Sequence, residues 1–312
     1  MLQENNVKKH AYLVMVHDNF DQLCLLLDMI DDVRNDIYIH IDKKSNYDAD
    51  KIKNSIKLSG LYILPNRIDV KWGHCSQIET EIALLEHAVA NEKYEYLHLI
   101  SGRCLPLVNQ NKMHEFFENN KGKEFVAVDN IDISRFSYRY KYYYNYLKFI
   151  RKPKKKFWKM CMVISNVFQK CVGINREKNI GKEIKKGANW FSITGSLAEY
   201  VIGQKEWIEE HFNSTLCCDE IFLQTIAYNS LYQDKLYQNL SCDSSLRFVD
   251  WKRGNPYTFG IEDYDMIMNS QCLFARKFDW NIDRDIIEKI YAEVMGKEYS
   301  YQNIDSTTHK ML

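Results

Sequence analysis

The stretch AYLVMVHDNFDQLCLLLDMIDDVRNDIYIHID, residues 11–42, decides the fold class. Residues 11–17 form a short apolar run of the β type, and residues 36–42 form a second one. Between them, DQLCLLLDMIDDV (21–33) carries apolar residues at helical spacing. A strand, a helix and a strand in this order predict two parallel strands with the helix packed across them.

The same alternation continues along the chain. The residues SQIETEIALLEHAVA (76–90) predict a strong amphipathic helix, with Ser76 and Glu79 at the spacing of a capping box. Short apolar runs predict further strands at 61–64, 68–72, 94–101, 124–129, 187–194 and 246–251. We therefore predict an α/β fold with a mostly parallel, Rossmann-like sheet flanked by helices.

Composition and charge exclude several classes of protein. The 312 residues hold 42 basic and 42 acidic side chains, and a net charge of zero argues against a general nucleic-acid binder. No apolar run approaches the ~20 residues that span a bilayer. The start of the chain, MLQENNVKKH, has no apolar signal core, which predicts a cytoplasmic protein.

The nine cysteines are scattered, and no C-x-x-C pair occurs. This pattern, together with a reducing cytoplasm, predicts neither a structural zinc site nor a disulfide framework. We expect the cysteines to be small core residues.

The middle of the chain is basic and aromatic. RFSYRYKYYYNYLKF (135–149) precedes IRKPKKKFWKMCMVISNVFQKCVGI (150–174), which joins a basic cluster to an apolar segment of helical spacing. Two interpretations stay open. The segment is a helix packed against the body with a solvated basic face, or it lies on a membrane surface and gives access to a lipid-linked substrate. The second interpretation predicts peripheral contact with the inner face of the membrane.

The loops that follow the predicted strands are the first place to look for a ligand, because parallel sheets bind ligands beyond the carboxyl ends of their strands. Neither a G-x-G-x-x-G fingerprint nor a G-x-x-x-x-G-K-[ST] loop occurs. The candidate nucleotide-binding residues in these loops are His17, Asp42, Trp72, Gly73 and Arg103.

The stretch LCCDEIFLQT (216–225) places two cysteines against two acids before a helix-compatible run. Asp219 is a standard N-cap residue, and Glu220 would favour the positive end of the helix dipole. On these residues alone, a structural role is favoured over a catalytic one.

Several motifs together resemble one family. AYLVMVH, IHIDKKS, VKWGHCSQIETEIALLEHA, YLHLISGRCLPL, GANWFSIT, CDEIFLQT, RFVDW and LFARKFD occur in this order between about residues 10 and 280. The ordered set resembles the Core-2/I-branching β-1,6-N-acetylglucosaminyltransferase family, which also contains peptide O-xylosyltransferases. The chain looks like a compact bacterial-type member that lacks the stem and membrane anchor of Golgi relatives.

The resemblance implies a GT-A-like glycosyltransferase fold that uses a UDP-sugar, with no cofactor and no divalent metal. The sequence agrees in one respect. Where many GT-A enzymes carry Asp-x-Asp to bind a cation, residues 101–104 read Ser-Gly-Arg-Cys and contain no carboxylate. Asp-x-Asp pairs at Asp48/Asp50, Asp263/Asp265 and Asp283/Asp285 stand in loop-like or helix-like contexts and are interpreted as chance pairs.

The resemblance also assigns roles to single residues. Glu220 is the general base and Asp219 caps the helix that aims it. Lys277 and Arg253 stabilise the diphosphate as UDP leaves. Trp251 packs on the acceptor sugar, although a core tryptophan at a strand end is an equal alternative. Arg135 and Arg139 are weaker acceptor-binding candidates. The family commonly has an acid where this chain has Cys104, which puts the donor sugar in question.

The resemblance predicts four parts of the chain. Residues 1–130 form a nucleotide-sugar-binding half, 131–185 a basic and aromatic insertion for acceptor or membrane contact, 186–296 an acceptor-binding and catalytic half, and 297–312 a tail.

The predicted function is transfer of a sugar, N-acetylglucosamine first, from a UDP-sugar to a glycan or lipid-linked glycan with inversion to a β-linkage, in synthesis of a bacterial surface polysaccharide. Alternatives are UDP-xylose or UDP-galactose as donor, a silent nucleotide-sugar-binding protein, and a Rossmann-type domain that uses another nucleotide.

Overall fold

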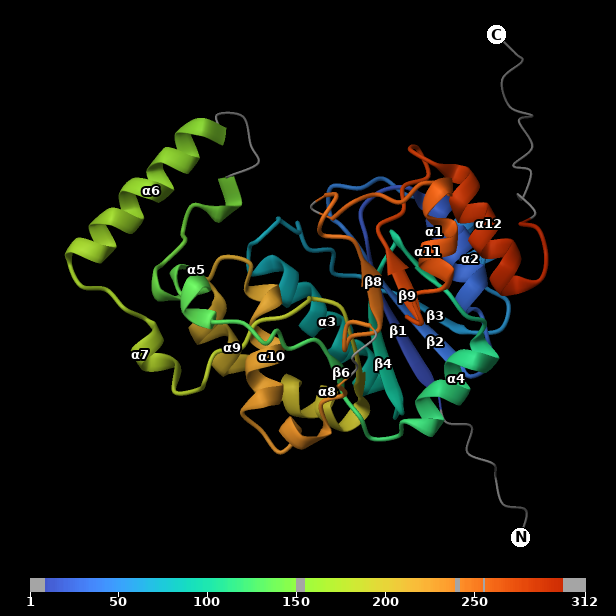
Figure 1. The fold of residues 1–312 in the computed structure, drawn as a ribbon, viewed down its shortest axis with the longest axis horizontal. Coiled ribbons are helices and arrows are strands. Elements are labelled where there is room, and N and C mark those ends of the chain that lie inside the picture. The colour runs from blue at the N-terminus through green and yellow to red at the C-terminus, as the bar shows by residue number, and fades with distance from the viewer. Residues whose placement is uncertain (1–8, 150–154, 239–241, 255, 300–312) are drawn as a thin grey trace.

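The computed structural model describes residues 9–149, 155–238, 242–254 and 256–299. A six-stranded sheet forms the centre of the molecule, with the strand order β3-β2-β1-β4-β7-β6 (Figure 1). Its strands are β1 (His10–Val16), β2 (Asn35–Ile41), β3 (Gly60–Ile63), β4 (Tyr96–Ser101), β6 (Phe125–Val126) and β7 (Phe191–Thr194). The first four are parallel to one another, and β7 runs antiparallel to β4 and β6. The predicted mostly parallel sheet is confirmed.

A second sheet of three short strands lies beside the first. Its order is β5-β9-β8, with β9 antiparallel to β5 and parallel to β8. The strands are β5 (Cys104–Pro106), β8 (Arg247–Val249) and β9 (Phe274–Arg276). Each sheet therefore combines strands from both halves of the sequence. The division into four parts stays a prediction, and most of its tail, 300–312, lies outside the described residues.

Helices cover both faces of the large sheet. The α-helices are α1 (Phe20–Ile30), α2 (Ala49–Asn54), α3 (Ser76–Asn91), α4 (Gln110–Asn119), α5 (Tyr138–Lys141), α6 (Lys155–Cys171), α7 (Glu177–Ile180), α8 (Gly195–Ile202), α9 (Lys205–Phe212), α10 (Phe222–Tyr228), α11 (Tyr264–Met268) and α12 (Arg284–Met295). The 3-10 helices are η1 (Ile133–Phe136), η2 (Leu147–Phe149), η3 (Cys218–Glu220), η4 (Gln233–Lys235) and η5 (Ile261–Asp263). No helix of the described residues is long and apolar enough to cross a membrane.

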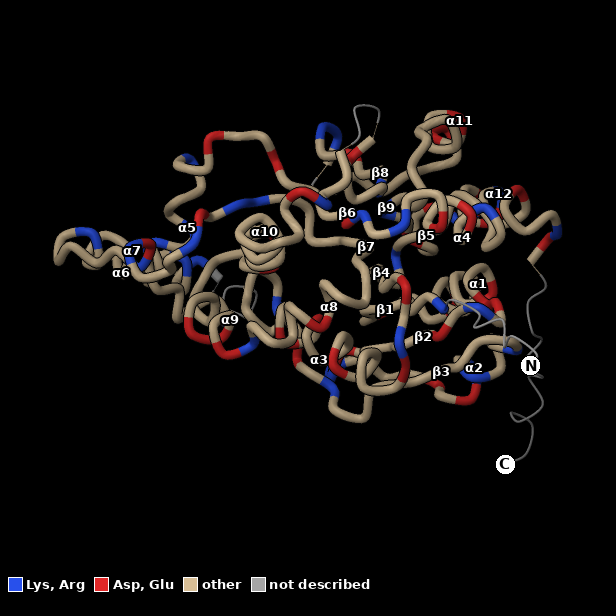
Figure 2. Tube along the Cα trace, turned by 90° about the horizontal axis from the view of Figure 1, so that it is seen from below, with Lys and Arg blue, Asp and Glu red and all other residues tan. Residues whose placement is uncertain are grey.

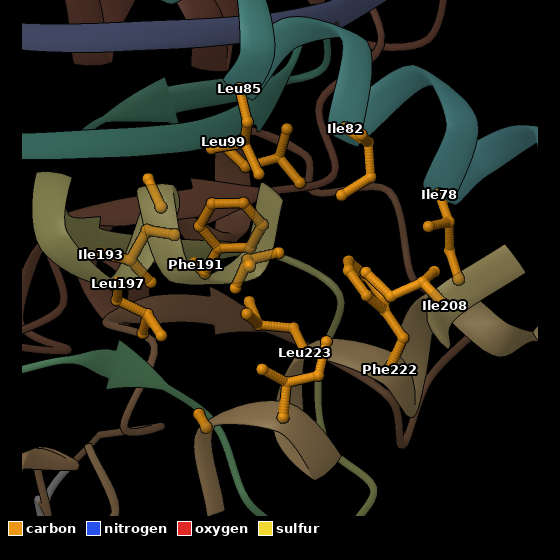
Figure 3. Packing of buried hydrophobic residues seen from close by; sticks show 14 of the residues in the cluster. Ile78, Ile82, Leu85, Leu99, Phe191, Ile193, Leu197, Ile208, Phe222 and Leu223 are labelled. Atoms are coloured by element: carbon orange, nitrogen blue, oxygen red, sulfur yellow. The ribbon is translucent and has the colours of Figure 1, made fainter. Parts of the chain in front are cut away.

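The core on one face of the sheet joins α3, α8, α9 and α10 to β4 and β7. Figure 3 shows Ile82 and Leu85 of α3 facing Leu99 and Phe191, with Phe222 of α10 close to Ile208 of α9. On the other face, side chains of α1 and α4 pack on β1 and β2. Strands covered on both faces explain the nearly continuous apolar runs of β1 and β2 in the sequence.

Three local predictions were wrong. Residues 68–72 form a loop, because the backbone N–H groups of Ile68 and Val70 donate to His40 Nε2 and Asp42 Oδ2 and not to a neighbouring strand. Ser76 begins α3, but its hydroxyl accepts from the Lys71 backbone N–H at 2.9 Å and does not cap the helix.

The third correction is a disulfide between Cys242 and Cys272. The two cysteines precede β8 and β9, which pair in parallel, so the sheet brings them together across 30 residues. Five other cysteines are buried, as predicted: Cys24, Cys75, Cys104, Cys217 and Cys218. The prediction was wrong for Cys171, which is exposed, and for Cys161, which is only partly buried. Disulfides are more common in oxidising compartments, and the cytoplasmic location stays a prediction.

The two sheets are joined by Arg247 of β8, which is 2% exposed. Its guanidinium donates to Ser192 Oγ at 2.9 Å and to the Phe191 carbonyl at 2.5 Å, both on β7, and to the Leu99 carbonyl of β4 at 3.3 Å. Burial lowers the pKa of Arg247 to about 10. No carboxylate of the described residues forms an ion pair with this buried cation, which carbonyl and hydroxyl oxygens hold instead.

We expect Arg247→Met to lower the free energy of unfolding by about 2–4 kcal/mol, because buried carbonyls lose their donor. Urea denaturation measures this loss, with Arg284→Met as the control. Arg284 lies on the exposed side of α12, where its ion pair with Glu288 contributes about 0.5 kcal/mol. A loss for Arg247→Met no larger than that of the control would contradict the prediction.

Candidate active site

The turn that carries Glu220 is held by three segments far apart in sequence. The backbone N–H of Cys217 donates to Gly73 O, that of Leu216 to Arg139 O, and that of Gly187 to Glu220 O, each at 3.0 Å. Cys217 adopts a left-handed backbone (φ 49°), which is uncommon for a residue other than glycine. Such strain persists only where the surroundings fix it, as they do at this turn.

Gly73 adjoins the same turn, although the sequence placed it in a nucleotide loop. Its φ of +68° suits glycine, and a Cβ there would lie 3.2 Å from Cys217 Sγ. Gln77 links the two loops, since its Oε1 accepts from Gly73 N at 2.8 Å and its Nε2 donates to Asp219 Oδ2 at 2.9 Å. The neighbouring Trp72 is 52% exposed.

The Glu220 carboxylate is half-buried between two cations. Its Oε2 accepts from Arg139 Nη1 at 2.7 Å and lies 3.6 Å from Lys186 Nζ. Lys186 in turn pairs with Asp129 at 3.0 Å. No donor among the described residues bonds to Oε1 of Glu220. One oxygen is thus anchored, and the other is open to an incoming hydroxyl group.

Sequence reasoning found part of this cluster. Arg139 was named as an acceptor-binding candidate, and the structure brings it to Glu220. Lys186 was missed, although it stands directly before the GANWFSIT motif. Arg135 lies exposed in η1, and no described contact joins it to Glu220.

Asp219 does not cap a helix, and that prediction was wrong. It lies in η3, whereas α10 begins at Phe222. Its side chain accepts from Gln77 and is buried. Burial, followed by the negative charge of Glu220, raises the pKa of Asp219 from 3.8 to about 7. Asp219 therefore supports the turn through Gln77.

A second cluster forms where β1, β4 and β9 end. Arg103 Nη2 donates to Asp18 Oδ2 at 2.6 Å, and Arg103 Nη1 forms an ion pair with Asp279. Burial opposes the charge of Arg103, but its bonds to the two carboxylates raise its pKa overall. This predicted nucleotide-binding residue therefore holds three loops together.

Lys277 lies beside this cluster. No carboxylate of the described residues pairs with its Nζ. Burial, and next the charge of Arg103, lower the pKa of Lys277. An unpaired, partly buried cation is suited to an anionic ligand.

Arg253 lies at the same edge of the small sheet, since it follows β8, whose Val249 pairs with Arg276. Unlike Lys277, it is already paired. Its Nε donates to Asp250 Oδ2 at 2.6 Å, and its Nη1 donates to Asp263 Oδ1 at 2.7 Å. Trp251, which precedes it by two residues, is 59% exposed.

The two remaining nucleotide candidates differ. His17 is exposed and lies 3.3 Å from Asp18. Asp42 is buried, and its carboxylate accepts from the backbone N–H groups of Lys44 and Val70 at 2.8 and 3.1 Å. Asp42 therefore fixes the loops beyond β2.

A cation–aromatic contact connects the two clusters. The guanidinium of Arg276 lies 4.3 Å from the ring centre of Trp190. Arg276 directly precedes Lys277. Trp190 stands three residues after Gly187, whose backbone N–H donates to Glu220 O. Sequence reasoning missed Arg276, although it stands in the quoted LFARKFD motif.

The first acid of each Asp-x-Asp pair has a structural role. Asp48 accepts from two backbone N–H groups at the start of α2, Asp263 pairs with Arg253, and Asp283 caps α12. Within the described ranges, no three His, Cys, Asp or Glu side chains are grouped to hold a metal ion. Metal independence stays a prediction.

A mostly apolar cavity of about 210 Å³ lies between α3 and α9. None of the predicted site residues lines it, so we place the candidate site at the two clusters.

Comparison with known proteins agrees with the motifs. The model of the Core-2/I-Branching enzyme family matches residues 10–267. The mostly parallel α/β fold and this match define the class, and the chain belongs to the Core-2/I-Branching enzyme family.

Among its relatives is xylosyltransferase 2 of Homo sapiens, 24% identical over 315 residues that cover 92% of this chain and 34% of the relative. Xylosyltransferase 2 of Canis lupus familiaris is 23% identical over 313 residues, with the same two shares. The chain thus spans about a third of the length of these relatives.

A solved structure, mouse xyloside xylosyltransferase 1 in its apo form, is similar with a TM-score of 0.36 and 9% identity. The similarity covers 85% of this chain and 97% of that one. At this level it carries no argument about function.

We expect Asp219→Asn to change how stability depends on pH. Between about pH 4 and 7 the unfolded chain has lost the Asp219 proton that the folded chain keeps, so the free energy of unfolding falls by about 1.4 kcal/mol per pH unit. The variant has no such proton. The free energy of unfolding of the variant minus that of wild type therefore rises by about 2–3 kcal/mol from pH 5 to pH 8. Urea denaturation at the two pH values measures this rise.

Glu115→Gln, on the exposed side of α4, is the control for the loss of one carboxylate. If the free energies of unfolding of Asp219→Asn and wild type differ by the same amount at pH 5 and pH 8, Asp219 does not keep its proton in the folded protein.

Proposed function

We propose that this chain is an inverting glycosyltransferase that uses a UDP-sugar without a divalent metal. It moves the sugar, N-acetylglucosamine first, to a glycan or lipid-linked glycan hydroxyl with a β-linkage. Family membership supports glycosyl transfer. The single observation that carries the assignment of the site is the Glu220 carboxylate, with one oxygen anchored by Arg139 and Lys186 and the other open.

In the proposed reaction, Oε1 of Glu220 takes the proton of the acceptor hydroxyl as its oxygen attacks the anomeric carbon. The bond from that carbon to UDP breaks on the opposite face, and its electron pair goes to the β-phosphate oxygen. One base is sufficient, since UDP leaves without a proton. Arg139 fixes the direction of the carboxylate, and a positioned base contributes about 10²- to 10⁴-fold.

The negative charge that grows on UDP requires fixed cations. Lys277 is the first candidate because its ammonium has no carboxylate partner among the described residues. Arg253 is the second, and it would have to exchange Asp250 or Asp263 for phosphate. Arg103 contributes by holding the loops that present Lys277.

A second donor is supported by a separate observation. The relatives named above are xylosyltransferases, and Cys104 stands where the family commonly has an acid. Cys104 is fully buried, and its sulfur lies 3.4 Å from Ser101 Oγ. UDP-xylose is therefore the alternative donor. The setting that we propose is synthesis of a bacterial surface polysaccharide.

The test is UDP release from a panel of UDP-sugars in EDTA. We expect one donor to be turned over, and Glu220→Gln to slow that turnover about 100-fold or more. Glu183→Gln is the matched control, because Glu183 also pairs with a lysine but is 62% exposed. Turnover that required Mn²⁺ would overturn the metal-free mechanism, and no binding of any UDP-sugar would overturn the glycosyltransferase assignment.

Lys277→Gln should weaken UDP binding about 10-fold or more, measured by calorimetry, because a charge-assisted contact to phosphate contributes about 1.5–3 kcal/mol. Lys289→Gln, an exposed lysine on α12, is the control. Equal affinities in both variants would remove Lys277 from the phosphate site.

A further inference from the structure

The helix α6 projects from the body of the protein (Figures 1 and 2), whereas the neighbouring α7 is anchored in the core by Ile180. One edge of the helix contacts the body, through Trp158, Met162, Asn166 and Gln169. Asn166 Nδ2 donates to the Tyr144 hydroxyl at 3.2 Å, and Gln169 Oε1 accepts from the Tyr143 backbone N–H at 2.7 Å. Trp158, near the start of α6, stacks on Phe149 at 4.4 Å. The attached edge thus combines polar side chains with Trp158 and Met162.

The apolar face of α6 points away from the body. Six large side chains of the helix are about half to two-thirds exposed, and a seventh follows directly after it: Phe157 49%, Met160 53%, Val163 57%, Ile164 60%, Val167 57%, Phe168 64% and Val172 55%. Spacings of three and four residues place them on one side of the helix. A soluble helix normally buries such a face, so an apolar surface of this size marks a site of interaction.

The stretch of sequence that contains α6 carries charges of a single sign. Residues 133–176 contain twelve Lys and Arg side chains and no Asp or Glu, in a chain whose net charge is zero. On α6 itself, Lys156, Lys159 and Lys170 are exposed. At about 100° per residue, these three lysines lie along one border of the apolar face. An anionic partner with an apolar interior fits both features.

We infer that α6 lies in the surface of a membrane that contains anionic lipids. Its apolar face enters the acyl boundary, and its lysines meet the lipid headgroups. The helix is too short and too polar to span a bilayer, which leaves a position parallel to the surface. A second copy of the chain fits less well, because pairing two such faces would bring two lysine borders together.

Of the two interpretations of the sequence, this inference adopts the membrane surface, and it does not rest on the proposed reaction. It does give that reaction a location. The segment 138–149 that anchors α6 contains Arg139, which holds Glu220. A sugar acceptor carried on a lipid would therefore approach the Glu220 turn from the membrane to which α6 binds.

The test is co-sedimentation of the full chain with vesicles of phosphatidylcholine alone or with about 30% phosphatidylglycerol. We expect binding to the anionic vesicles to exceed binding to the neutral ones by about tenfold or more, and to weaken at high salt. The double substitution Ile164→Glu and Phe168→Glu should reduce it by about tenfold or more. Leu58→Glu, an equally exposed apolar residue elsewhere, is the matched control and should bind as wild type.

Circular dichroism confirms that each variant folds. Absence of binding to anionic vesicles, or equal binding by the double variant, would overturn the inference. A dimer in sedimentation velocity that the double variant dissociates, with no vesicle binding by wild type, would assign the face to a second copy.

Discussion

The buried guanidinium of Arg247 links the two sheets, and the position of Arg103, Arg253 and Lys277 relative to the large sheet depends on this link. Arg247 reaches from β8 to the backbone of β4 and β7. The carboxyl end of β4 leads to Arg103, β8 leads to Arg253, and β9, the neighbour of β8, leads to Lys277. A shift of the small sheet would move the cations relative to the large one. Breaking these hydrogen bonds of Arg247 is costly, because the site is buried and no water can replace the lost donors.

The Glu220 turn depends on a different constraint, which is the convergence of three loops. Gly73, Arg139 and Gly187 each make one backbone hydrogen bond to residues 216–220. A Cβ on Gly187 would lie 1.7 Å from the Ala127 carbonyl oxygen, so the chain passes there with no space for a side chain. The left-handed Cys217 is stable only inside this frame. The direction of the Glu220 carboxylate is therefore a property of the whole fold.

The sequence predicted those features that local pattern controls. The apolar runs at 11–17 and 36–42 correspond to β1 and β2, because strands buried on both faces have few polar positions. The segment 68–72 has an equally good pattern, yet it forms a loop, because the side chains of His40 and Asp42 take its backbone N–H groups. The prediction of Ser76 as a cap was wrong for a similar reason, since its hydroxyl accepts a hydrogen bond from the backbone N–H of Lys71. Such competition between partners is not visible in a window of sequence.

The sequence likewise predicted some residues of the candidate site and not others. Motif order indicated Glu220 and Lys277, since each stands inside a quoted stretch. The partners of these residues come from distant segments, and nothing near Arg139 or Asp279 in sequence indicates the contact. The Cys242–Cys272 disulfide was missed because its two ends meet only after β8 and β9 pair.

The strand order of the small sheet also has a consequence for synthesis of the protein. β9 is the last strand among the described residues, yet it lies in the centre of its sheet, between β5 and β8. The early strands of the large sheet can pair while the ribosome is still translating, at about 5–20 residues per second. The small sheet cannot close until residues 274–276 have left the exit tunnel. A nascent chain therefore carries the Glu220 turn before it carries Lys277, and a prematurely terminated product would lack the cation that we assign to the diphosphate.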